Sequence, residues 1–405
     1  MIVHKYGGSS VAAPEKIRAL ADILKKKAQD DDGIVVIVSA MGKTTDSLIA
    51  LAKEVSDGSP DPRELDMLLV TGEQVSAALL AMALKSAGVE AISRNANQLQ
   101  VASTDFYGDA RIRDINAARL LSDLEKHSVV VVTGFQGVAD GGDMTTLGRG
   151  SSDTLAVAIA AKLGVDCEIY SDVAGVYAFD PNKIDGVRKL DYIQYDEMLE
   201  LAALGAKVLH SRAVEVAKRY NVKLYCGSTF SDERGTYVVA QLPEWVEQPA
   251  VTGLAVDRNQ TKFALKKLPH AEDILSILFE ALAGTANVDM IAMAGDDVTF
   301  TAREAEKDRI ASLVEERLKP YTGWEMEISD GVAKVSAVGV GMNTATGVAG
   351  RFFSALRAEN VGVLGVSTSE INISALLRAD QADRAVMGLA NEFGLIERKD
   401  RVSES

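Results

Sequence analysis

GIVVIVSAMGKTTDSLIALAKEV, residues 33–55, contains the pattern that decides the fold of the first half of the chain. The β-branched run from Ile34 to Val38 predicts a short, buried strand. DSLIALAKEV predicts a helix, with Thr44 or Thr45 as its N-cap. A strand followed directly by a helix is the repeating unit of α/β folds.

Gly42-Lys43-Thr44 lies between this strand and this helix and matches the last residues of a phosphate-binding P-loop. A P-loop needs another glycine five residues earlier, so that a wide loop of backbone N–H groups can surround the phosphates. That position holds Ile37, inside the strand. We therefore exclude a P-loop. The hydroxyl groups of Ser39, Thr44 and Thr45 remain either helix caps or donors that line a site.

Strand and helix patterns alternate from residue 1 to about residue 235. Helical stretches such as PEKIRALADILKKKAQ separate runs that are typical of strands. These runs are IVHKY (2–6), GIVVIVS (33–39), SVVVVTGF (128–135), CEIYSD (167–172) and VKLYC (222–226). The alternation predicts an α/β fold in which a mostly parallel sheet is sandwiched between helices.

The bulk composition indicates a globular protein of two or three domains. The chain has 405 residues and a formal net charge of −15, which argues against nucleic-acid and anionic-membrane partners. Its two cysteines, Cys167 and Cys226, are expected to be inert and half-buried in a reducing compartment. We find no signal-peptide pattern, and the apolar runs are too short to span a membrane, so we expect a cytoplasmic location.

The sequence beyond residue 253 repeats itself at an offset of about 73 residues. Phe279 aligns with Phe353, and TFTAR (299–303) aligns with ISALL (373–377). Each copy is expected to form a strand, a helix, two strands and a second helix, a small α+β unit. Tandem copies without catalytic-looking clusters favour a regulatory module that also dimerises, and a module that only dimerises is the alternative.

Two glycine-rich turns in the first half could hold an anion. In KYGGSS (5–10), Gly7 and Gly8 would let backbone N–H groups approach a phosphate, and Lys5 would add a positive charge. The alternative for this stretch is a tight turn with a surface lysine. In residues 133–164 a glycine-rich loop leads into a helix near Ser152, and free N–H groups at such a helix start favour an anion.

These stretches together resemble the aspartate kinases (aspartokinases), which are members of the amino acid kinase family. The resemblance covers nearly the whole chain, and its tandem repeat is similar to the paired ACT domains that follow the kinase domain in that family. The motifs that carry it are KYGGSSV (5–11), SAMGKTTD (39–46), TGEQVS (71–76), GFQG (134–137), TTLGRGSSD (145–153), EIYSDVAGVY (168–177), GAKVLHSRA (205–213) and STSEINIS (367–374).

The resemblance implies an amino acid kinase catalytic domain at 1–235, a linker at 236–253 and two ferredoxin-like ACT domains at 254–328 and 329–398. It implies transfer of the γ-phosphoryl group of Mg-ATP to the β-carboxylate of L-aspartate, giving 4-phospho-L-aspartate. This product would serve lysine, threonine, methionine and diaminopimelate synthesis. Mg²⁺ would be held mainly by phosphate oxygens, so we expect no dedicated metal site in the protein.

The residues of each implied site are carried over from the family motifs. The implied catalytic residues are Lys5, Lys207 and Asp153, with Asp153 orienting the lysines. The implied nucleotide contacts are Lys5, Tyr6, Gly7, Gly8, Ser39, Ser171, Asp172, Tyr177, Asp180 and Lys207. The implied aspartate contacts are Thr45, Glu73, Phe135, Arg149, Gly150, Ser151 and Ser152. Among them, Glu73 would bind the ammonium group and Arg149 would bind a carboxylate. The implied contacts of an amino-acid effector are His270, Asn287, Asp289, Ser369 and Glu370.

The chain departs from the family pattern at several of these positions. Ser151 stands where a glycine is common, and its Cβ would narrow access to the backbone. The turn at Pro269-His270 lacks a glycine that would meet an effector carboxylate, and two acids, Glu272 and Asp273, follow it. Feedback inhibition by lysine or threonine is therefore expected to be weakened or altered.

The expected partners are ATP, L-aspartate and a second copy of the chain, which would form a homodimer through the ACT-like repeats. Two other functions remain open. The chain could be another amino acid kinase, acting on N-acetylglutamate, glutamate or UMP. It could also be an amino-acid sensor whose kinase domain has lost its chemistry.

Overall fold

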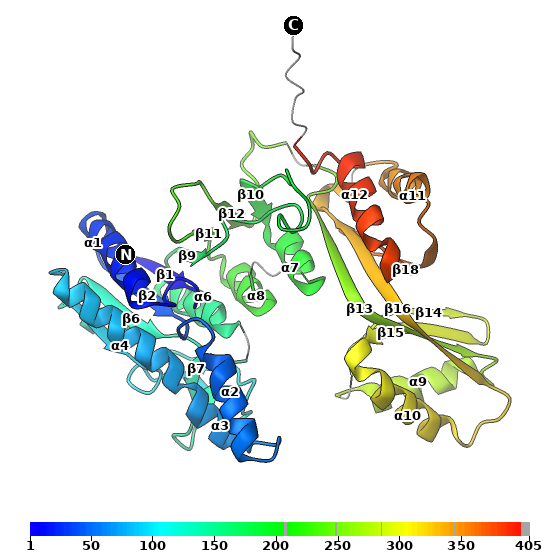
Figure 1. Ribbon diagram of the computed structural model, residues 1–405, viewed down its shortest axis with the longest axis horizontal. Helices are drawn as coiled ribbons and strands as arrows, with labels where there is room; N and C mark the ends of the chain where they lie inside the picture. The colour runs from blue at the N-terminus through cyan, green and yellow to red at the C-terminus, as the bar shows by residue number, and fades with distance from the viewer. Residues whose placement is uncertain (149, 206–208, 248, 285, 344, 398–405) are drawn as a thin grey trace, which may run out of the picture. The chain divides into compact units, whose positions relative to one another are not determined.

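The computed structural model describes residues 1–148, 150–205, 209–247, 249–284, 286–343 and 345–397 (Figure 1). The chain divides into two units, which are described separately below. The first contains Met1–Val176, Lys189–Ala202 and residues 209–246. The second contains Tyr177–Arg188, residues 203–205 and the described residues from Glu247 onward.

The first unit is built on an eight-stranded sheet with the order β10-β12-β11-β9-β1-β2-β6-β3. The five expected strands are present as β1 (Ile2–Tyr6), β2 (Ile34–Val38), β6 (Val129–Thr133), β9 (Cys167–Ser171) and β11 (Leu224–Ser228). The other strands are β3 (Ala91–Arg94), β10 (Tyr192–Gln194) and β12 (Thr236–Val239). Neighbouring strands from β11 to β3 are parallel, and β12 is antiparallel to β11. The prediction of a mostly parallel sheet is confirmed.

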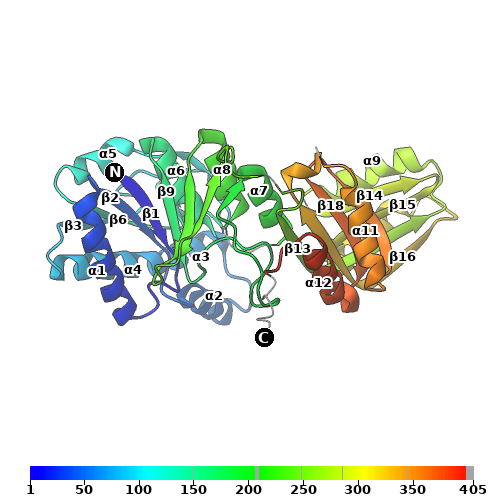
Figure 2. The same cartoon turned by 90° about the horizontal axis from the view of Figure 1, so that it is seen from above.

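Helices cover both faces of this sheet, as Figure 2 shows. α1 (Pro14–Asp30) and α4 (Thr71–Ser86) lie on one face. α5 (Ala117–Leu124), α6 (Ser151–Leu163) and α8 (Ser211–Tyr220) lie on the other. Every residue of β2 and β6 is consequently buried, which explains why both strands are unbroken β-branched runs.

The expected cap of the helix in the opening stretch is wrong. α2 (Thr44–Val55) has Thr44 as its first helical residue, and its N-cap, Lys43, makes no side-chain capping bond. The Thr44 hydroxyl donates instead to the Met41 carbonyl, at 2.7 Å. The threonine therefore stabilises the turn that precedes the helix, and Thr45 becomes the second helical residue.

The helical stretch of residues 62–86, which contains α3 (Pro62–Leu69) and α4, is long and apolar enough by composition to cross a membrane. Half of the most apolar segment of this stretch is buried inside the fold. Ala77, Leu80 and Leu84 of α4 pack in the core cluster with β1, β2 and α1. Core packing thus accounts for the apolar character of this stretch.

Both cysteines are buried more deeply than the sequence predicts. Cys167 is 0% exposed and Cys226 is 3% exposed, and both thiols are free. Burial raises the pKa of each thiol well above its usual value, so both stay protonated and unreactive.

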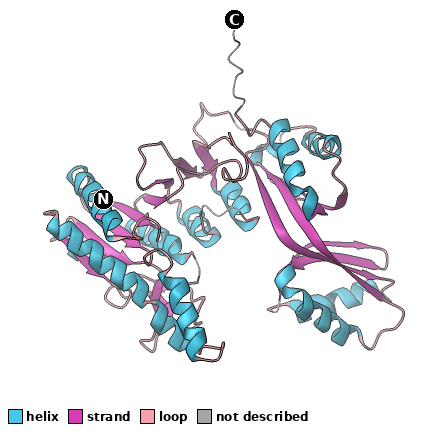
Figure 3. Ribbon diagram, in the orientation of Figure 1, coloured by secondary structure: helices cyan, strands magenta, loops and turns pink. Residues whose placement is uncertain are grey.

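The second unit confirms the expected internal repeat (Figure 3). The first copy consists of β13 (Gly253–Lys266), α9 (Ala271–Leu282), β14 (Val288–Ala294), β15 (Asp297–Arg303) and α10 (Lys307–Leu318). The second consists of β16 (Glu325–Val338), α11 (Val348–Ala358), β17 (Val363–Thr368), β18 (Asn372–Arg378) and α12 (Ala382–Glu392). Arg303 and Arg378 end corresponding strands, so the copies align one residue away from the TFTAR and ISALL match.

The two copies share one six-stranded sheet, with the order β14-β15-β13-β16-β18-β17. The long strands β13 and β16 pair with each other along most of their length, antiparallel. The early part of β13 pairs with residues 332–338 of β16, and the late part with residues 325–329. β16 therefore crosses the expected boundary between residues 328 and 329, and β12 lies inside the expected linker.

The core of the first copy is centred on Phe300, which is fully buried. Its ring stacks on Phe263 at a centroid distance of 5.0 Å and meets Phe279 edge-on at 5.8 Å. Trp324 packs against the same cluster and can serve as a fluorescence probe for it.

Phe300→Ala should therefore destabilise the second unit by about 3–5 kcal/mol, because it removes a buried ring and leaves a cavity. Phe279→Ala should lower the free energy of unfolding by less, because the Phe279 side chain is only half-buried. The measurement is urea unfolding followed by Trp324 fluorescence, in a Trp245→Phe background. Equal effects of the two substitutions would contradict this description of the core.

Candidate active site

The carboxyl ends of the parallel strands form one edge of the eight-stranded sheet, where loops from distant segments can build a site. β1 lies between β2 and β9, so the glycines after Tyr6 lie between the loops that follow Val38 and Ser171. The Ser39 N–H donates to the Tyr6 carbonyl at 3.2 Å, and the Gly7 N–H donates to the Tyr170 carbonyl at 3.1 Å. Three loops that the sequence singles out are thus joined by backbone hydrogen bonds.

Lys5 and Asp153 form an ion pair at this edge. Lys5 Nζ lies 2.7 Å from Asp153 Oδ1, and only 12% and 11% of the two side chains are exposed. Lys5 is contributed by β1 and Asp153 by the first turn of α6. The partial positive charge of a helix start favours both a carboxylate and a further anion, so this corner of the sheet is suited to phosphate.

The two glycines after β1 have different roles. A Cβ on Gly8 would lie 2.6 Å from the Ala40 carbonyl oxygen, which would force the backbone to move. A Cβ on Gly7 would lie 3.7 Å from Lys5 Nζ, an ordinary contact. Gly8 therefore packs the loops after β1 and β2 together, while Gly7 lies beside the Lys5 ammonium group without such crowding.

Glu73 is a buried carboxylate in the first turn of α4, 3% exposed. Its Oε1 accepts the Ala40 N–H at 3.0 Å, whereas its Oε2 has no hydrogen-bond partner among the described residues. Burial raises the pKa of Glu73 to about 7, and the Ala40 hydrogen bond opposes that rise. A buried carboxylate with one unpaired oxygen has the chemistry to accept a hydrogen bond from a cation such as an ammonium group.

Gly72 lets this carboxylate approach the loop after β2. A Cβ on Gly72 would lie 2.9 Å from the Ala40 Cβ and 3.6 Å from the Thr44 methyl carbon. The start of α4 therefore packs directly against the start of α2, where Thr45 is half-buried. Thr45 and Glu73 are thus contributed by neighbouring turns.

The loop that leads into α6 carries the expected aspartate contacts. Arg149 lies outside the described residues, but Gly148 and Gly150 on either side of it have left-handed backbones, with φ of 87° and 73°. Ser151 is the first residue of α6, and its hydroxyl donates to the Gly148 carbonyl at 2.5 Å. Because Ser151 has helical geometry, its Cβ causes no backbone strain at this position.

Phe135 and Ser152 lie where the loop after β6 packs on the first turn of α6. Phe135 has a left-handed backbone with φ of 66°, a conformation that costs a non-glycine residue about 1–2 kcal/mol. A Cβ on Gly134 would lie 2.5 Å from Ser152 Oγ, so the first turn of α6 packs on the loop after β6. The Leu147 N–H donates to the Phe135 carbonyl at 2.9 Å and helps to hold this strained residue.

The structure adds two residues that the sequence reasoning missed. Asp66 of α3 is 1% exposed, and it accepts hydrogen bonds from the backbone N–H of Gly108 and from both the N–H and the hydroxyl of Thr146. It thereby fixes the strand β8 (Met144–Thr146) that leads to Gly148. A lone carboxylate among the apolar residues of LDMLL was the available signal.

His210 is the second such residue. A Cβ on Gly150 would lie 2.6 Å from His210 Cδ2, so the imidazole ring fills the space that a side chain at position 150 would need. The pattern of the sequence gives no sign of this contact, because the two residues lie on different segments.

The expected nucleotide contacts are only partly brought together. Tyr6 is 1% exposed and stacks on Tyr170 at a centroid distance of 5.1 Å, so only its backbone is available to a ligand. Ser171 ends β9 at the site edge, and the exposed Asp172 follows it. Tyr177 and Asp180 belong to the second unit, where the Asp180 carboxylate accepts the Asn182 N–H at 3.0 Å. Lys207 lies outside the described residues.

The expected effector contacts lie in both copies of the repeat. His270 has a left-handed backbone with φ of 55° and directly precedes α9. The Asp289 carboxylate forms an ion pair with Lys334 of β16, and Asn287 is exposed. Ser369 and Glu370 lie in the turn between β17 and β18, and no described hydrogen bond joins them to the first copy.

Comparisons with known proteins agree with this architecture. The amino acid kinase family matches residues 1–228, more than half of the chain, and the ACT domain matches residues 335–393. The aspartokinase of Mycobacterium tuberculosis (strain H37Rv) is 44% identical over 98% of this chain and 96% of its own length.

Two crystal structures of E. coli aspartokinase III are also similar, at 26% identity. The complex with aspartate and ADP (R-state) gives a TM-score of 0.84 and covers 97% of this chain and 100% of that one. The complex with lysine and aspartate (T-state) gives 0.75, with 97% and 99% covered. From the sheet edge, the repeated second unit and these relatives, we conclude that the chain belongs to the aspartokinases of the amino acid kinase family.

Proposed function

We propose that this aspartokinase transfers the γ-phosphoryl group of Mg-ATP to the β-carboxylate of L-aspartate, giving 4-phospho-L-aspartate. The observation that carries the proposal is the Lys5–Asp153 ion pair at the strand edge, beside the start of α6. We further propose that the product supplies lysine, threonine, methionine and diaminopimelate synthesis in the cytoplasm.

The reaction needs no general base, because a carboxylate with a pKa near 4 is already ionised at neutral pH. The difficulty lies in bringing one anion against the anionic phosphates of ATP. Catalysis then depends on alignment and on positive charge around the phosphoryl group as it is transferred. Mg²⁺ enters as part of the substrate Mg-ATP, with mainly phosphate oxygens as its ligands.

The nucleotide-binding part of the proposed site would be formed by the loops after β1, β2 and β9. Lys5 would contact the phosphates, and Gly7 has no side chain that would stand beside the Lys5 ammonium group. Asp153 would hold the Lys5 ammonium group in position without reacting itself. By family resemblance, Lys207 would add a second positive charge, and Ser39, Ser171, Asp172, Tyr177 and Asp180 would line the nucleotide.

The aspartate-binding part of the proposed site would be formed by the start of α4 and the loop that leads into α6. The free Oε2 of Glu73 would accept the α-ammonium group, and Thr45 lies on the neighbouring turn. Arg149 would bind a carboxylate of the substrate, with Phe135, Gly150, Ser151 and Ser152 around it. The two charged ends of aspartate would thus be held by groups of opposite sign.

Lys5→Ala should lower kcat by about 10²–10³-fold, because it removes a preorganised positive charge from the transferred phosphoryl group. Lys27→Ala is the matched control, since Lys27 also pairs with a carboxylate, Glu168 at 2.8 Å, but is no part of the proposed site. Steady-state rates and circular dichroism spectra of both variants make the test. Near-normal turnover of a folded Lys5→Ala enzyme would refute the assignment.

Glu73 should make aspartate binding depend on pH. Its pKa of about 7 means that it takes up a proton and loses its charge as the pH falls from 8 to 6, so KM for aspartate should rise over that range. Glu73→Gln should raise KM at pH 8 and remove most of this dependence.

Glu197→Gln serves as the control, because Glu197 is also buried but lies on α7 (Tyr195–Ala203), away from the proposed site. The measurement is KM and kcat for aspartate at several pH values. A pH dependence that persists unchanged in Glu73→Gln would show that another group controls aspartate binding.

We also propose that the second unit regulates weakly, or through an altered effector. An amino-acid carboxylate approaching the start of α9 would meet the His270 side chain and two first-turn acids, Glu272 and Asp273. Its ammonium group would have to compete with Lys334 for Asp289. Both ends of a lysine or threonine ligand are therefore disfavoured.

Lysine plus threonine at about 1 mM each should inhibit initial rates by less than half. The triple variant His270→Gly, Glu272→Gln, Asp273→Asn should be inhibited more strongly, because it restores the glycine and removes both charges. Inhibition of the unmodified protein at micromolar effector would contradict the proposal.

We propose that the second unit also forms the homodimer. The strands at the two edges of its sheet, β14 and β17, expose apolar side chains. Ile291 and Met293 are 52% and 46% exposed, and Leu364 and Val366 are 42% and 48% exposed. Exposed, apolar edge strands are typical sites of strand pairing between chains.

A further inference from the structure

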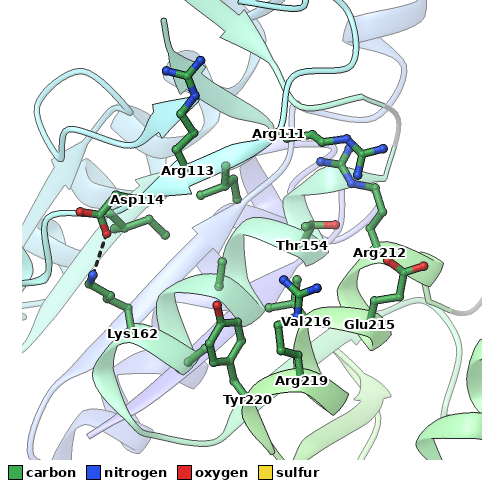
Figure 4. Close-up of a pocket in the computed structure, with 14 residues that line it drawn as sticks. Arg111, Arg113, Asp114, Thr154, Lys162, Arg212, Glu215, Val216, Arg219 and Tyr220 are labelled. Atoms are coloured by element: carbon green, nitrogen blue, oxygen red, sulfur yellow. Dashed lines mark hydrogen bonds and ion pairs between the residues drawn. The ribbon is translucent and has the colours of Figure 1, made fainter. Parts of the chain in front are cut away.

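A groove of about 480 Å³ lies between α6, α8 and the strand β5 (Ile112–Asp114) of the first unit (Figure 4). α6 contributes Thr154, Ala158, Ala161 and Lys162, and α8 contributes residues from Arg212 to Tyr220. None of these residues belongs to the proposed nucleotide or aspartate contacts. The groove is therefore a separate feature of the first unit.

The groove is strongly basic, although the chain as a whole carries a formal charge of −15. Its two acidic residues are Asp114 and Glu215. Its basic residues are Arg111, Arg113, Lys162, Arg212 and Arg219. A concentration of positive charge in an acidic protein favours the binding of an anion at that place.

The basic residues differ in how far they are already neutralised. Lys162 pairs with Asp114 at 2.6 Å, and Arg113 pairs with Asp140 at 2.6 Å. Arg111 and Arg219 form no ion pair within the described part of the chain. These two guanidinium groups are therefore available to a ligand.

Arg212 adds a guanidinium group that is fixed in place. It donates to Asp109 Oδ1 at 2.9 Å, to the Leu147 carbonyl at 2.6 Å and to the Ala110 carbonyl at 3.1 Å. Its side chain is only 18% exposed, so its position is set by the fold before any ligand binds. Preorganised arginines are the common partners of phosphate groups.

Thr154 supplies an independent sign of a missing partner. The residue lines the groove and is 3% exposed, yet its buried hydroxyl has no hydrogen-bond partner among the described residues. Figure 4 shows this hydroxyl on the side of the groove where Arg111 and Arg212 lie. Buried hydroxyl groups are normally satisfied, so an unsatisfied one here is suited to a ligand oxygen.

The remaining walls are apolar. Ile115, Ala158 and Val216 line the groove together with the ring of Tyr220, which is 59% exposed. An exposed tyrosine ring in a groove with apolar side chains can hold a flat, apolar group. The groove thus combines an anion-binding end with space for a hydrophobic body.

We propose that this groove is a second ligand site, which binds a small phosphate monoester that carries an apolar or aromatic body. The phosphate would lie among Arg111, Arg212 and Arg219, within reach of the Thr154 side chain. Thr154 directly follows Asp153, so the ligand would touch the turn of α6 that holds the Lys5 partner. The binding site itself does not depend on the proposed kinase activity.

The test is calorimetric titration of the full-length protein with phenyl phosphate. Inorganic phosphate and phenol serve as probes of the two halves of the ligand. The double variant Arg111→Gln, Arg219→Gln should weaken phenyl phosphate binding by about tenfold or more, because two charge-assisted hydrogen bonds are lost. Arg113→Gln, whose partner lies outside the groove, should stay within about twofold of the unmodified protein.

Lys5→Ala separates this site from the active site and should also leave the affinity within about twofold. Both phosphate and phenol should bind more weakly than phenyl phosphate. Loss of binding in Lys5→Ala with retention in the groove variant would place the probe at the active site and overturn the proposal. Absence of binding to the unmodified protein at about 10 mM phenyl phosphate would overturn it too.

Discussion

The Lys5–Asp153 ion pair is the interaction on which the rest of the site depends. It joins the central strand β1 to the first turn of α6, and both side chains are nearly buried. Removing one member of such a pair leaves the other charge buried without a partner. The pair therefore fixes the position of an ammonium group that a surface lysine would leave mobile. Gly8 and Gly134 serve the same end, because a Cβ on either would push apart the loops around this pair.

The two proposed sites of the first unit share one property: each has a local charge distribution that differs from the net negative charge of the chain. The proposed active site combines a positive Lys5 on β1 with a buried Glu73 in the first turn of α4, so that it could hold a phosphate and an ammonium group at once. The basic groove lies along α6 and α8, and two of its guanidinium groups, those of Arg111 and Arg219, have no carboxylate partner among the described residues. In both places the local arrangement of charge, and not the net charge of the chain, determines which ligand is favoured.

The sequence predicts the parts of this protein that are set by local patterns. The strands β2 and β6 are continuous β-branched runs, and the tandem repeat is visible as a recurring order of strands and helices. Contacts between distant segments were not predictable in the same way. Asp66 accepts a hydrogen bond from Thr146, and the His210 ring fills the space beside Gly150. β13 of the first copy pairs with β16 of the second copy. The wrong cap at Thr44 has a local cause, because the Thr44 hydroxyl donates to the Met41 carbonyl three residues earlier.

The site around Lys5 is proposed to phosphorylate aspartate. The measurement that decides this is the Mg-ATP-dependent rate with L-aspartate, L-glutamate, N-acetylglutamate and UMP in parallel, with hydroxylamine present to trap any acyl phosphate as a hydroxamate. We expect rapid hydroxamate formation with L-aspartate and little product with the other three substrates. Selective turnover of another substrate, or no turnover of any, would contradict it.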